Sequence, residues 1–412
     1  MRIEEFTSKT CDGRSRVSAT VIWEGSERPN QEIYFETEAE FGHSLWCHPD
    51  AFLIASVFPA AREREKRVLL KEPVCPELRA GLVTIMNLYR HWYGPDYKPV
   101  QIEGPSRISP ISAPEPRRAA SFLTGGIDSL ATLRANRLSF PLEHPGSIKE
   151  AILVFGLEVE NEEAFEFAKS AVSKVAQAAG VTLIPVYTNI RSLLDDWVFW
   201  YSEYMGAALS AVAHALSRRL SVAYIASDYD IPNIAPHGSH PLVEPNCSSF
   251  ELRVRYDGIT LSRFGKIKLI ADWDEALQNI RVCNRFEYYR PDRLNCGECE
   301  KCIRTMLGLV AAGALKRSRA FPHTDVSEEL LSRASFGDKV FPFYQELISP
   351  LEEIGRLDLA RTIRRRRAQF KRAQALNWRE PLTRFDQTYL RGSLGRLKRL
   401  AAGIPAALGW SS

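Results

Sequence analysis

The sequence predicts an α/β fold in which a parallel sheet carries helices on both faces. From residue 119 to residue 226, continuous apolar runs of strand length alternate with segments of helical composition, a pattern typical of strands buried on both sides. A glycine pair directly after the first run also indicates a strand-to-helix crossover. The 412 residues, 45% of them hydrophobic and 25% charged, suffice for two or three domains with a sizeable core.

The order of the core elements follows from this alternation. Asn161 is expected to cap one helix, and Gly180 is expected to end it. The expected elements are strand 119–123, helix 128–137, strand 151–155, helix 161–179, strand 181–187, helix 201–220 and strand 222–226. Ligands of such sheets bind beyond the carboxyl ends of the strands, so we expect the site at the segments that follow the strands. These segments are 124–129, 156–158, 188–189 and the residues from 227 onward.

The glycine pair belongs to a hexapeptide that indicates a phosphate-binding loop: Thr124, Gly125, Gly126, Ile127, Asp128 and Ser129. Neither glycine has a β-carbon to block an anion, and the N–H groups at the start of the next helix favour negative charge. The alternative is a plain turn in which Asp128 or Ser129 caps the helix.

The hexapeptide has neither the lysine of ordinary P-loops nor the third glycine of dinucleotide-binding loops. It resembles the PP-loop of the ATP pyrophosphatase superfamily, Ser-Gly-Gly-x-Asp-Ser between a strand and a helix, with Thr124 keeping the hydroxyl of the first serine. The resemblance implies an adenine nucleotide α-hydrolase-like fold, binding of ATP with Mg²⁺, and transfer of AMP to a substrate oxygen. Asp128 then either contacts Mg²⁺ through water or only caps the helix.

Four of the eight cysteines form a cluster with metal-ligand spacing: Cys283, Cys296, Cys299 and Cys302. Thiolates two residues apart can converge on one tetrahedral ion, and Gly297 eases the turn, so a structural Zn²⁺ is expected. An iron–sulfur or redox site and unliganded thiols are the alternatives. The other cysteines are scattered and are expected to be ordinary thiols: Cys11, Cys47, Cys75 and Cys247.

The loop and the cysteines together resemble the 7-cyano-7-deazaguanine synthase branch of the superfamily, over about residues 117–313. In that branch four cysteines bind zinc, and ATP drives conversion of a ring carboxylate and ammonia, through an adenylate and an amide, into a nitrile. The chain departs from the branch in three respects. The gap between Cys283 and Cys296 is longer, the substrate loop lacks the Asp-Tyr-Ser-Gly-Tyr pattern, and large segments flank the core.

A long polar loop follows the strand 222–226, and loops of this length are usually functional. The resemblance implies that it closes over substrate and nucleotide. Its candidate residues are Asp228, His237, Ser239, His240 and Glu244. The alternative is a solvated loop whose histidines cap turns.

The candidate catalytic residues are Asp128, Lys266 and His240, the histidine for proton transfer. Lys266, one of three basic residues expected to precede an apolar helix, is the candidate for countering phosphate charge.

The flanking segments are expected to be additions to the core. Residues 1–97 are expected to form a small N-terminal α/β accessory domain with strands 16–24 and 31–37 and a helix over 77–93. Five prolines mark 98–117 as a stiff linker. The core with the cysteine site then covers 118–322, and 323–412 is a basic helical C-terminal extension.

The C-terminal extension carries a strong charge asymmetry. Residues 356–400 contain fourteen Lys and Arg and three Asp and Glu, a local charge of +11 in a chain of net charge +4. The run Arg364–Arg367 could track a nucleic-acid backbone or an acidic partner. A leucine stripe would suit a partner helix or a membrane interface: Leu390, Leu394, Leu397 and Leu400. The alternative is a solvated helical tail.

These features predict an ATP-dependent, amidotransferase-like ligase that activates a carboxylate or amide oxygen of a small-molecule acid for attack by a nitrogen donor. One alternative is a nucleic-acid or protein modifying enzyme on the same core, acting by tRNA thiolation or deazaguanine attachment. A nucleotide-sensing subunit of a larger assembly is another. No transmembrane run or secretory signal is visible, so a cytoplasmic location is expected, and a homodimer is one assembly that the sequence allows.

Overall fold

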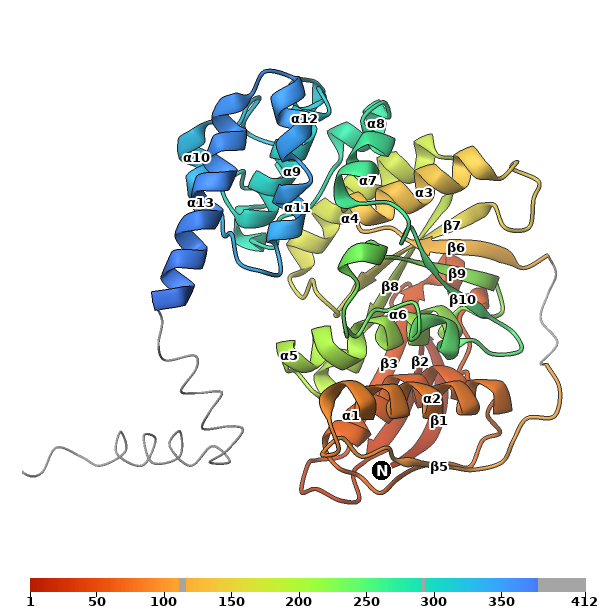
Figure 1. Cartoon of the computed structure of the whole chain (residues 1–412). Helices are drawn as coiled ribbons and strands as arrows, with labels where there is room; N and C mark the ends of the chain where they lie inside the picture. Colours follow the sequence, from red (N-terminus) through yellow and green to blue (C-terminus); the bar gives the residue numbers. More distant parts are fainter. Residues whose placement is uncertain (111–115, 291–292, 377–412) are drawn as a thin grey trace, which may run out of the picture. The chain divides into compact units, whose positions relative to one another are not determined.

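The computed structural model describes residues 1–110, 116–290 and 293–376 (Figure 1). The chain divides into two compact units, Met1–Ala334 and Ser335–Ser412. The first unit contains one ten-stranded sheet with helices packed against it, which confirms the prediction of an α/β fold.

Five strands of the sheet are parallel and lie in the spatial order β8-β7-β6-β9-β10. Their bounds are β6 Arg118–Phe122, β7 Ile148–Phe155, β8 Thr182–Thr188, β9 Leu220–Ala226 and β10 Arg253–Asp257. The first four correspond to the predicted strands, and β10 was not predicted. This is the 3-2-1-4-5 order of doubly wound sheets.

The direction of winding reverses once. From β6 the chain moves outward through β7 to β8, and it then crosses to the other side of β6 to form β9 and β10. Because parallel crossovers are right-handed, helices of the two directions cover opposite faces. Helices α3 (Ile127–Ser139) and α4 (Glu162–Ala178) connect the strands from β6 through β7 to β8, and α6 (Met205–Ala215) lies in the connection from β8 back to β9. The reversal lies between β6 and β9, where open α/β sheets bind ligands.

The N-terminal segment continues this sheet. Strands β1 (Arg2–Cys11), β2 (Arg14–Ile22) and β3 (Gln31–Glu38) are antiparallel, and β3 pairs with β8. Strands β4 (Arg67–Leu70) and β5 (Gln101–Glu103) complete the far edge. The sequence predicts a separate accessory domain and a linker here, but the structure includes these residues in one compact unit because β3 covers the edge of β8.

Helices of the N-terminal segment share the core with α6. Helix α1 (Pro49–Arg62) packs against α6, and α2 (Pro76–Tyr93) packs against α1. Residues 49–61 of α1 are all buried, so this helix shows no polar face in the sequence and was not predicted.

The predicted helix 201–220 is shorter in the structure. Residues Trp197–Phe199 form the short α5, Trp200–Tyr204 form a π-helical turn, and α6 ends at Ala215. A turn then leads into β9 at Leu220, with the N–H of Arg219 donating to the carbonyl of Leu216. Both sides of this turn are apolar, and a continuous apolar run does not show where a buried helix gives way to a strand.

The rest of the first unit is helical, with α7 (Arg263–Ile270), α8 (Asp274–Gln278), α9 (Glu300–Ala311) and α10 (Glu328–Ser332). Short 3₁₀ turns cover Ala39–Ser44, Ile190–Leu193, Ile231–Asn233, Glu244–Cys247, Phe286–Tyr288 and Leu315–Arg317.

The second unit contains α11 (Phe341–Gln345), α12 (Ile348–Glu353) and α13 (Leu357–Leu376). The helical character predicted for the C-terminal extension holds for this part, although the unit begins at residue 335 rather than 323. The predicted leucine stripe at 390–400 lies outside the described residues. No helix in the described part of the chain is long and apolar enough to cross a membrane.

Candidate functional site

The glycine loop lies at the reversal point between β6 and β9. Gly125 has φ +79°, and a β-carbon there would lie 3.2 Å from Cβ of Arg281. Gly126 is the N-cap residue of α3, and the hydroxyl of Ser129 donates to its carbonyl at 3.0 Å. Neither Asp128 nor Ser129 therefore occupies the N-cap position. The first N–H groups of α3, which have no acceptor within the helix, are those that a bound anion would meet.

Asp128 is held between two cations of α7. Arg263 Nη1 lies 2.8 Å from Asp128 Oδ2, and Lys266 Nζ lies 3.0 Å from Asp128 Oδ1. Burial raises the pKa of Asp128, but the positive charges of Arg263 and Lys266 outweigh burial, and the pKa is lowered overall. The carboxylate is therefore ionised at neutral pH.

Lys266 also joins the end of β9 to the loop. Its ammonium donates to the hydroxyl of Ser227 at 2.9 Å and to the carbonyl of the same residue at 2.5 Å. The side chain is 2% exposed. The sequence predicts Lys266 ahead of an apolar helix, whereas the structure shows it inside α7, which is capped by the Ser262 hydroxyl.

One substrate-loop candidate, Asp228, interacts electrostatically with Asp128, and a second, His237, interacts with Asp228. Burial raises the pKa of Asp228, and the negative charge of Asp128 raises it further, while His237 and Arg263 act in the opposite direction. The ring of His237 packs against Tyr201 and Tyr229. Asp228 and His237 thus belong to the same charged neighbourhood as the glycine loop.

The other three loop candidates bond to one another. The hydroxyl of Ser239 donates to Glu244 Oε1 at 2.5 Å, and the N–H of His240 donates to Glu244 Oε2 at 2.7 Å. Burial raises the pKa of Glu244 to about 8, and burial lowers the pKa of His240. The ring of His240 packs edge-on against Trp92, and its Nδ1 accepts from the N–H of Leu242. These contacts hold the loop in its folded shape.

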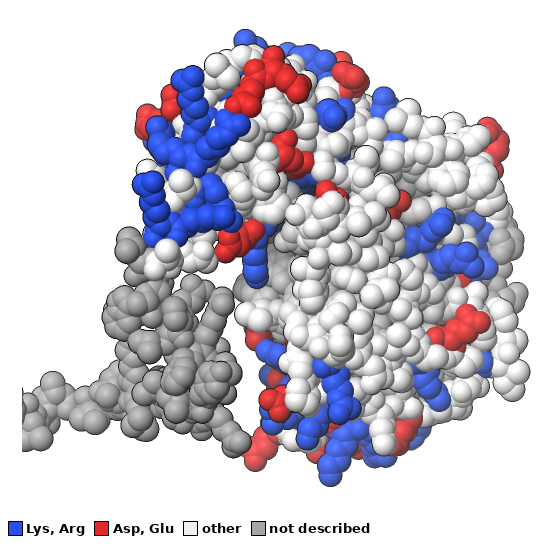
Figure 2. Space-filling model, viewed as in Figure 1, with Lys and Arg blue, Asp and Glu red and all other residues white. Residues whose placement is uncertain are grey.

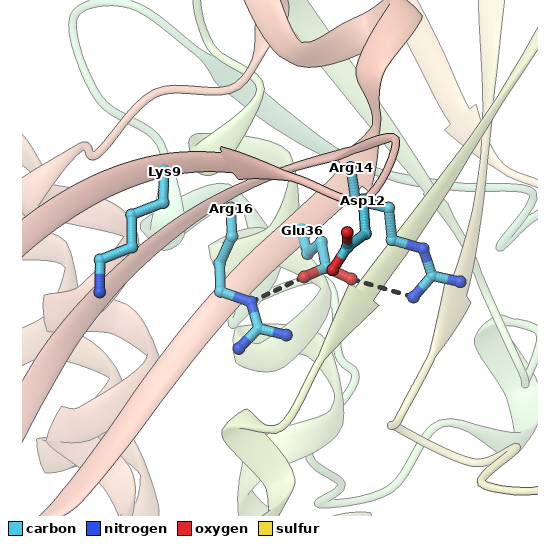
Figure 3. Close-up of a pocket in the computed structure, with 5 residues that line it drawn as sticks. All are labelled: Lys9, Asp12, Arg14, Arg16 and Glu36. Carbon is cyan, nitrogen blue, oxygen red and sulfur yellow. Dashed lines mark hydrogen bonds and ion pairs between the residues drawn. The ribbon is translucent and has the colours of Figure 1, made fainter.

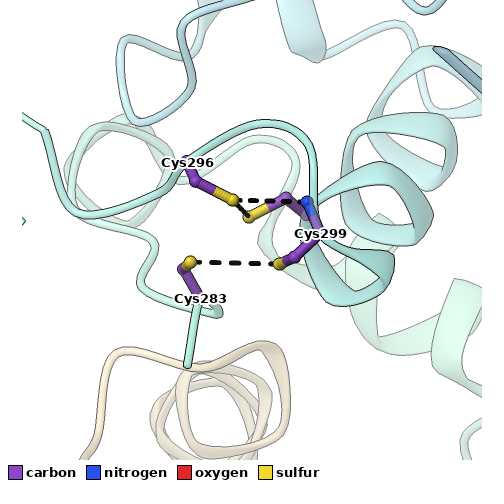
Figure 4. Close-up of side chains that lie close together, drawn as sticks. Cys283, Cys296 and Cys299 are labelled. Carbon is purple, nitrogen blue, oxygen red and sulfur yellow. Dashed lines mark hydrogen bonds between the residues drawn. The ribbon is translucent and has the colours of Figure 1, made fainter. Parts of the chain in front are cut away.

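The four predicted cysteines converge (Figure 4). Their sulfur atoms all lie within 4.8 Å of one another, and the pairs Cys283–Cys299 and Cys296–Cys302 are each separated by 3.9 Å. Four thiolates around a tetrahedral zinc at 2.3 Å are about 3.8 Å apart, so the group could hold a zinc ion. A multi-iron cluster would separate the sulfurs further, because its own atoms fill the centre. Cys47, Cys75 and Cys247 are free thiols, as predicted.

Local bonding shapes the cysteine group. The buried Asn295 accepts from the N–H groups of Val282 and Cys283 and donates to the carbonyls of Ile280 and Ala320. Gly297 has φ +78°, and a β-carbon there would lie 2.5 Å from Pro322 Cγ. The glycine is therefore required for the turn, as the sequence predicts.

Arg281 connects the cysteine group to the glycine loop. Its N–H donates to the carbonyl of Gly125 and its Nε donates to the carbonyl of Thr124, both at 2.8 Å. Its Nη1 donates to the hydroxyl of Tyr289, which donates to the carbonyl of Cys283. A single residue, Val282, thus separates the arginine that contacts the loop from a cysteine of the group.

The sequence places Arg263 with Lys266 and Lys268 among the three basic residues that could counter phosphate charge, but it indicates no role for Arg281 or Arg304; all three arginines act on the loop. Arg304 lies in α9, and its charge lowers the pKa of Asp128. Arg281 precedes Cys283 by two residues, and Arg304 follows Cys302 by two. This spacing was the available signal: one arginine lies two positions before the first cysteine of the set, and another lies two positions after the last.

In a second group of possible metal ligands, an arginine of the protein already neutralises the carboxylates. His48, Asp50 and Glu251 are buried with ligand atoms within 4.8 Å of one another. However, Arg107 Nη2 lies 2.7 Å from a carboxylate oxygen of both Asp50 and Glu251. A guanidinium therefore fills the position that a cation would take, and the group is an ion-pair network that fastens the chain after β5 to the start of α1.

A pocket of ≈ 480 Å³ is lined by Lys9, Asp12, Arg14, Arg16 and Glu36 (Figure 3). Arg14 and Arg16 both bond to Glu36, at 3.0 and 2.7 Å, and their guanidinium groups stack on Tyr187 and Tyr34. None of the site residues predicted from the sequence lines it.

Comparison with protein-family models, with curated proteins and with solved structures finds no match to this chain. A function for the chain therefore depends on the fold and on the geometry of the two sites described above.

Proposed function

We propose that this chain is an ATP-dependent ligase that transfers AMP to a carboxylate or amide oxygen and then delivers nitrogen to the activated carbon. The parallel core is then of the adenine nucleotide α-hydrolase-like kind. The observation that carries the proposal is the position of the glycine loop at the winding reversal, with Asp128 fixed by two cations of α7.

The charge balance around the loop favours a polyanion. Asp128 supplies one negative charge, whereas Lys266 and Arg263 contact it directly and Arg304 acts on it electrostatically. Asp228 is a second carboxyl in this neighbourhood, with a raised pKa, and Arg304 also pairs with Glu300 at 3.5 Å. A triphosphate at the loop would place its negative charge beside the three cations and the N-terminus of α3. Lys266 is anchored on Ser227 and is therefore already positioned, without a further loss of side-chain entropy on binding.

The proposed reaction has two steps. A substrate oxygen forms a bond to the α-phosphorus of ATP, the bond from that phosphorus to the bridging oxygen breaks, and pyrophosphate leaves. The nitrogen donor, ammonia or an equivalent amine, then bonds to the activated carbon, releases a proton and displaces AMP. Cations near the β,γ-phosphates stabilise the leaving pyrophosphate, which gains charge as the bond breaks.

Asp228 and His237 are our candidates for accepting the proton. Asp228 interacts electrostatically with Asp128, and His237 interacts with Asp228; burial raises the pKa of Asp228 above its ordinary value, which makes its carboxylate a stronger base. His240, the catalytic candidate from the sequence, is 7% exposed and accepts from the N–H of Leu242. Its proposed role is to shape the loop rather than to transfer the proton.

The proposed cofactors are ATP with Mg²⁺ and a structural Zn²⁺. Zinc held by Cys283, Cys296, Cys299 and Cys302 would saturate its four positions with thiolates and leave none for substrate, so it would stabilise the fold and take no part in the reaction. Mg²⁺ would offset triphosphate charge.

The experiment is a search for acid-dependent release of AMP and pyrophosphate. Small molecules that co-purify with the protein are first identified by mass spectrometry, because a trapped adenylate names the acid. The purified chain is then incubated with ATP, Mg²⁺, ammonia and that acid. We expect AMP and pyrophosphate in equal amounts, and no turnover in Gly126→Arg, whose side chain fills the loop. ADP as the product, or full turnover by Gly126→Arg, would refute the proposal.

A further inference from the structure

We propose that the exposed face of α13 binds the phosphate backbone of double-helical nucleic acid. Residues 357–376 contain seven Lys and Arg and a single acid, Asp358. Figure 2 shows Lys and Arg gathered over the second unit, on the side toward the viewer. This inference is independent of the proposed ligase activity.

The cations form a row along the helix. The exposed members are Arg361, Arg364, Arg365, Lys371 and Arg372. At 100° per residue all five fall within an arc of about 120°, and the row is about 16 Å long. Neighbours at three- and four-residue spacing have β-carbons about 5–6 Å apart, so the row presents several charges to one linear polyanion at once.

The remaining two arginines serve the unit itself. Arg367 contacts Asp338 at 2.7 Å and the carbonyl of Phe336 at 3.0 Å, and Arg366 lies over the ring of Phe336. Within the row, Arg365 donates to the hydroxyl of Thr362 at 3.2 Å, and Arg364 pairs with Glu352, whose side chain is 36% exposed. Exposed pairs contribute little, so the cost of exchanging Glu352 for a phosphate is small.

The apolar side of the helix argues against a membrane as the partner. Leu359, Ala360 and Ile363 are each 0% exposed, and α13 packs against α11 and α12. A helix that lies on a membrane must bury its apolar face in the lipid, and here that face is already covered by protein. Four of the five cations in the row are arginines, which bind phosphate through two parallel N–H groups.

The test is the salt dependence of binding to a labelled 20-base-pair RNA or DNA duplex, followed by fluorescence anisotropy with the full chain. If all five cations neutralise phosphates, the slope of log K against log salt receives about −4.5 from this row. The triple variant Arg361→Gln/Lys371→Gln/Arg372→Gln should reduce the steepness of the slope by about 3 and weaken binding at least tenfold at low salt.

The matched control is Lys66→Gln/Lys71→Gln/Lys98→Gln, which removes the same charge from exposed positions of the first unit. It should bind nearly as the natural chain does. Equal loss of affinity in both variants would mean that only net charge matters and would overturn the proposal. So would unchanged binding in the α13 variant, or binding to anionic phospholipid vesicles or an acidic polypeptide but not to the duplex.

Discussion

Arg281 Nε donates a hydrogen bond to the carbonyl of Thr124 at 2.8 Å, across 157 residues of sequence. With the second bond from its N–H to the carbonyl of Gly125, this arginine holds the two successive peptide groups on either side of the Gly125 Cα. Because Cys283 lies only two residues further along the chain, the position of Arg281 depends on how firmly the cysteine group is held.

Removal of the zinc that we propose for the cysteine group should therefore weaken nucleotide binding, although no residue of the loop itself is changed. Treatment with a strong chelator, or the variant Cys299→Ser, is expected to lower the affinity for an ATP analogue about tenfold, which corresponds to about 1.4 kcal/mol. Isothermal titration of treated and untreated protein measures this. Cys47→Ser, which alters a thiol outside the group, is the control and should bind normally. Equal affinity before and after chelation would show that the two sites are independent.

The variant Arg281→Gln distinguishes the effect of Arg281 on the glycine loop from the effect of the cysteine group. It leaves all four cysteines in place, so we expect a full zinc content by elemental analysis together with weakened binding of the analogue. Loss of zinc in this variant would indicate that Arg281 supports the cysteine group instead.

Asp128→Asn should destabilise the fold in a pH-dependent manner. The change leaves Arg263 and Lys266 facing a neutral amide, at a cost on the order of 3 kcal/mol. Since the pKa of Asp128 is lowered in the folded state, its stabilising contribution is complete above its ordinary pKa and is lost as pH falls through the folded value. Urea unfolding at pH 7 and at about pH 3 should show the deficit shrinking. As a control, Glu329→Gln removes an exposed ion pair with Arg333 and should cost less than about 1 kcal/mol at either pH.

Glu244→Gln should reduce the loss of stability that the natural chain shows as pH rises from 5 to 8. The pKa of Glu244 is raised by burial to about 8, so between its ordinary pKa and pH 8 the folded state holds a proton that the unfolded state releases. Stability therefore falls as pH rises through this window, by at most about 1.4 kcal/mol per pH unit from this group. The amide can keep both bonds, to Ser239 and His240, and the variant should show a flatter profile in chemical unfolding between pH 5 and pH 8. A profile as steep as that of the natural chain would exclude Glu244 as the source.

Gly156→Ala and Gly180→Ala compare two glycines on either side of α4, the first directly after β7 and the second shortly before β8. Both glycines have positive φ, +91° and +63°. A β-carbon at 156 would lie 1.8 Å from the carbonyl oxygen of Thr188, whereas nothing lies within 4 Å at 180. We expect a loss of about 1 kcal/mol for Gly180→Ala and clearly more, about 3 kcal/mol, for Gly156→Ala. Thermal unfolding of the pair measures the difference, and equal losses would mean that Thr188 moves away freely.

Local patterns predicted the parallel core well. The apolar runs correspond to β6 to β9, and the Asn161 side chain caps α4 as expected, by accepting from the N–H of Ala164 at 2.8 Å. The N-terminal segment could not be placed, because the pairing of β3 with β8 joins Phe35 to Thr188 and leaves no trace in either local sequence.

In the candidate site, too, local motifs could be predicted from the sequence and long-range contacts could not. The glycine loop and the cysteine set are continuous or closely spaced motifs, so they were visible in the sequence. Whether Lys266 contacts Asp128, 138 residues earlier, depends on how α7 docks against α3, and no pattern within α7 indicates that. The internal bonds of Ser239 and Glu244 were likewise invisible, because polar residues in a loop suggest solvent or substrate before they suggest each other.

Titration of the full chain with Mg²⁺ and α,β-methylene ATP, which cannot be cleaved at the α-phosphorus, tests the central claim most directly. The account predicts saturable binding of one nucleotide per chain, and its loss in Gly126→Arg, with unchanged thermal stability of that variant. A natural chain that does not bind the analogue, or a Gly126→Arg variant that binds it equally well, would contradict the claim that the Thr124–Ser129 loop holds ATP.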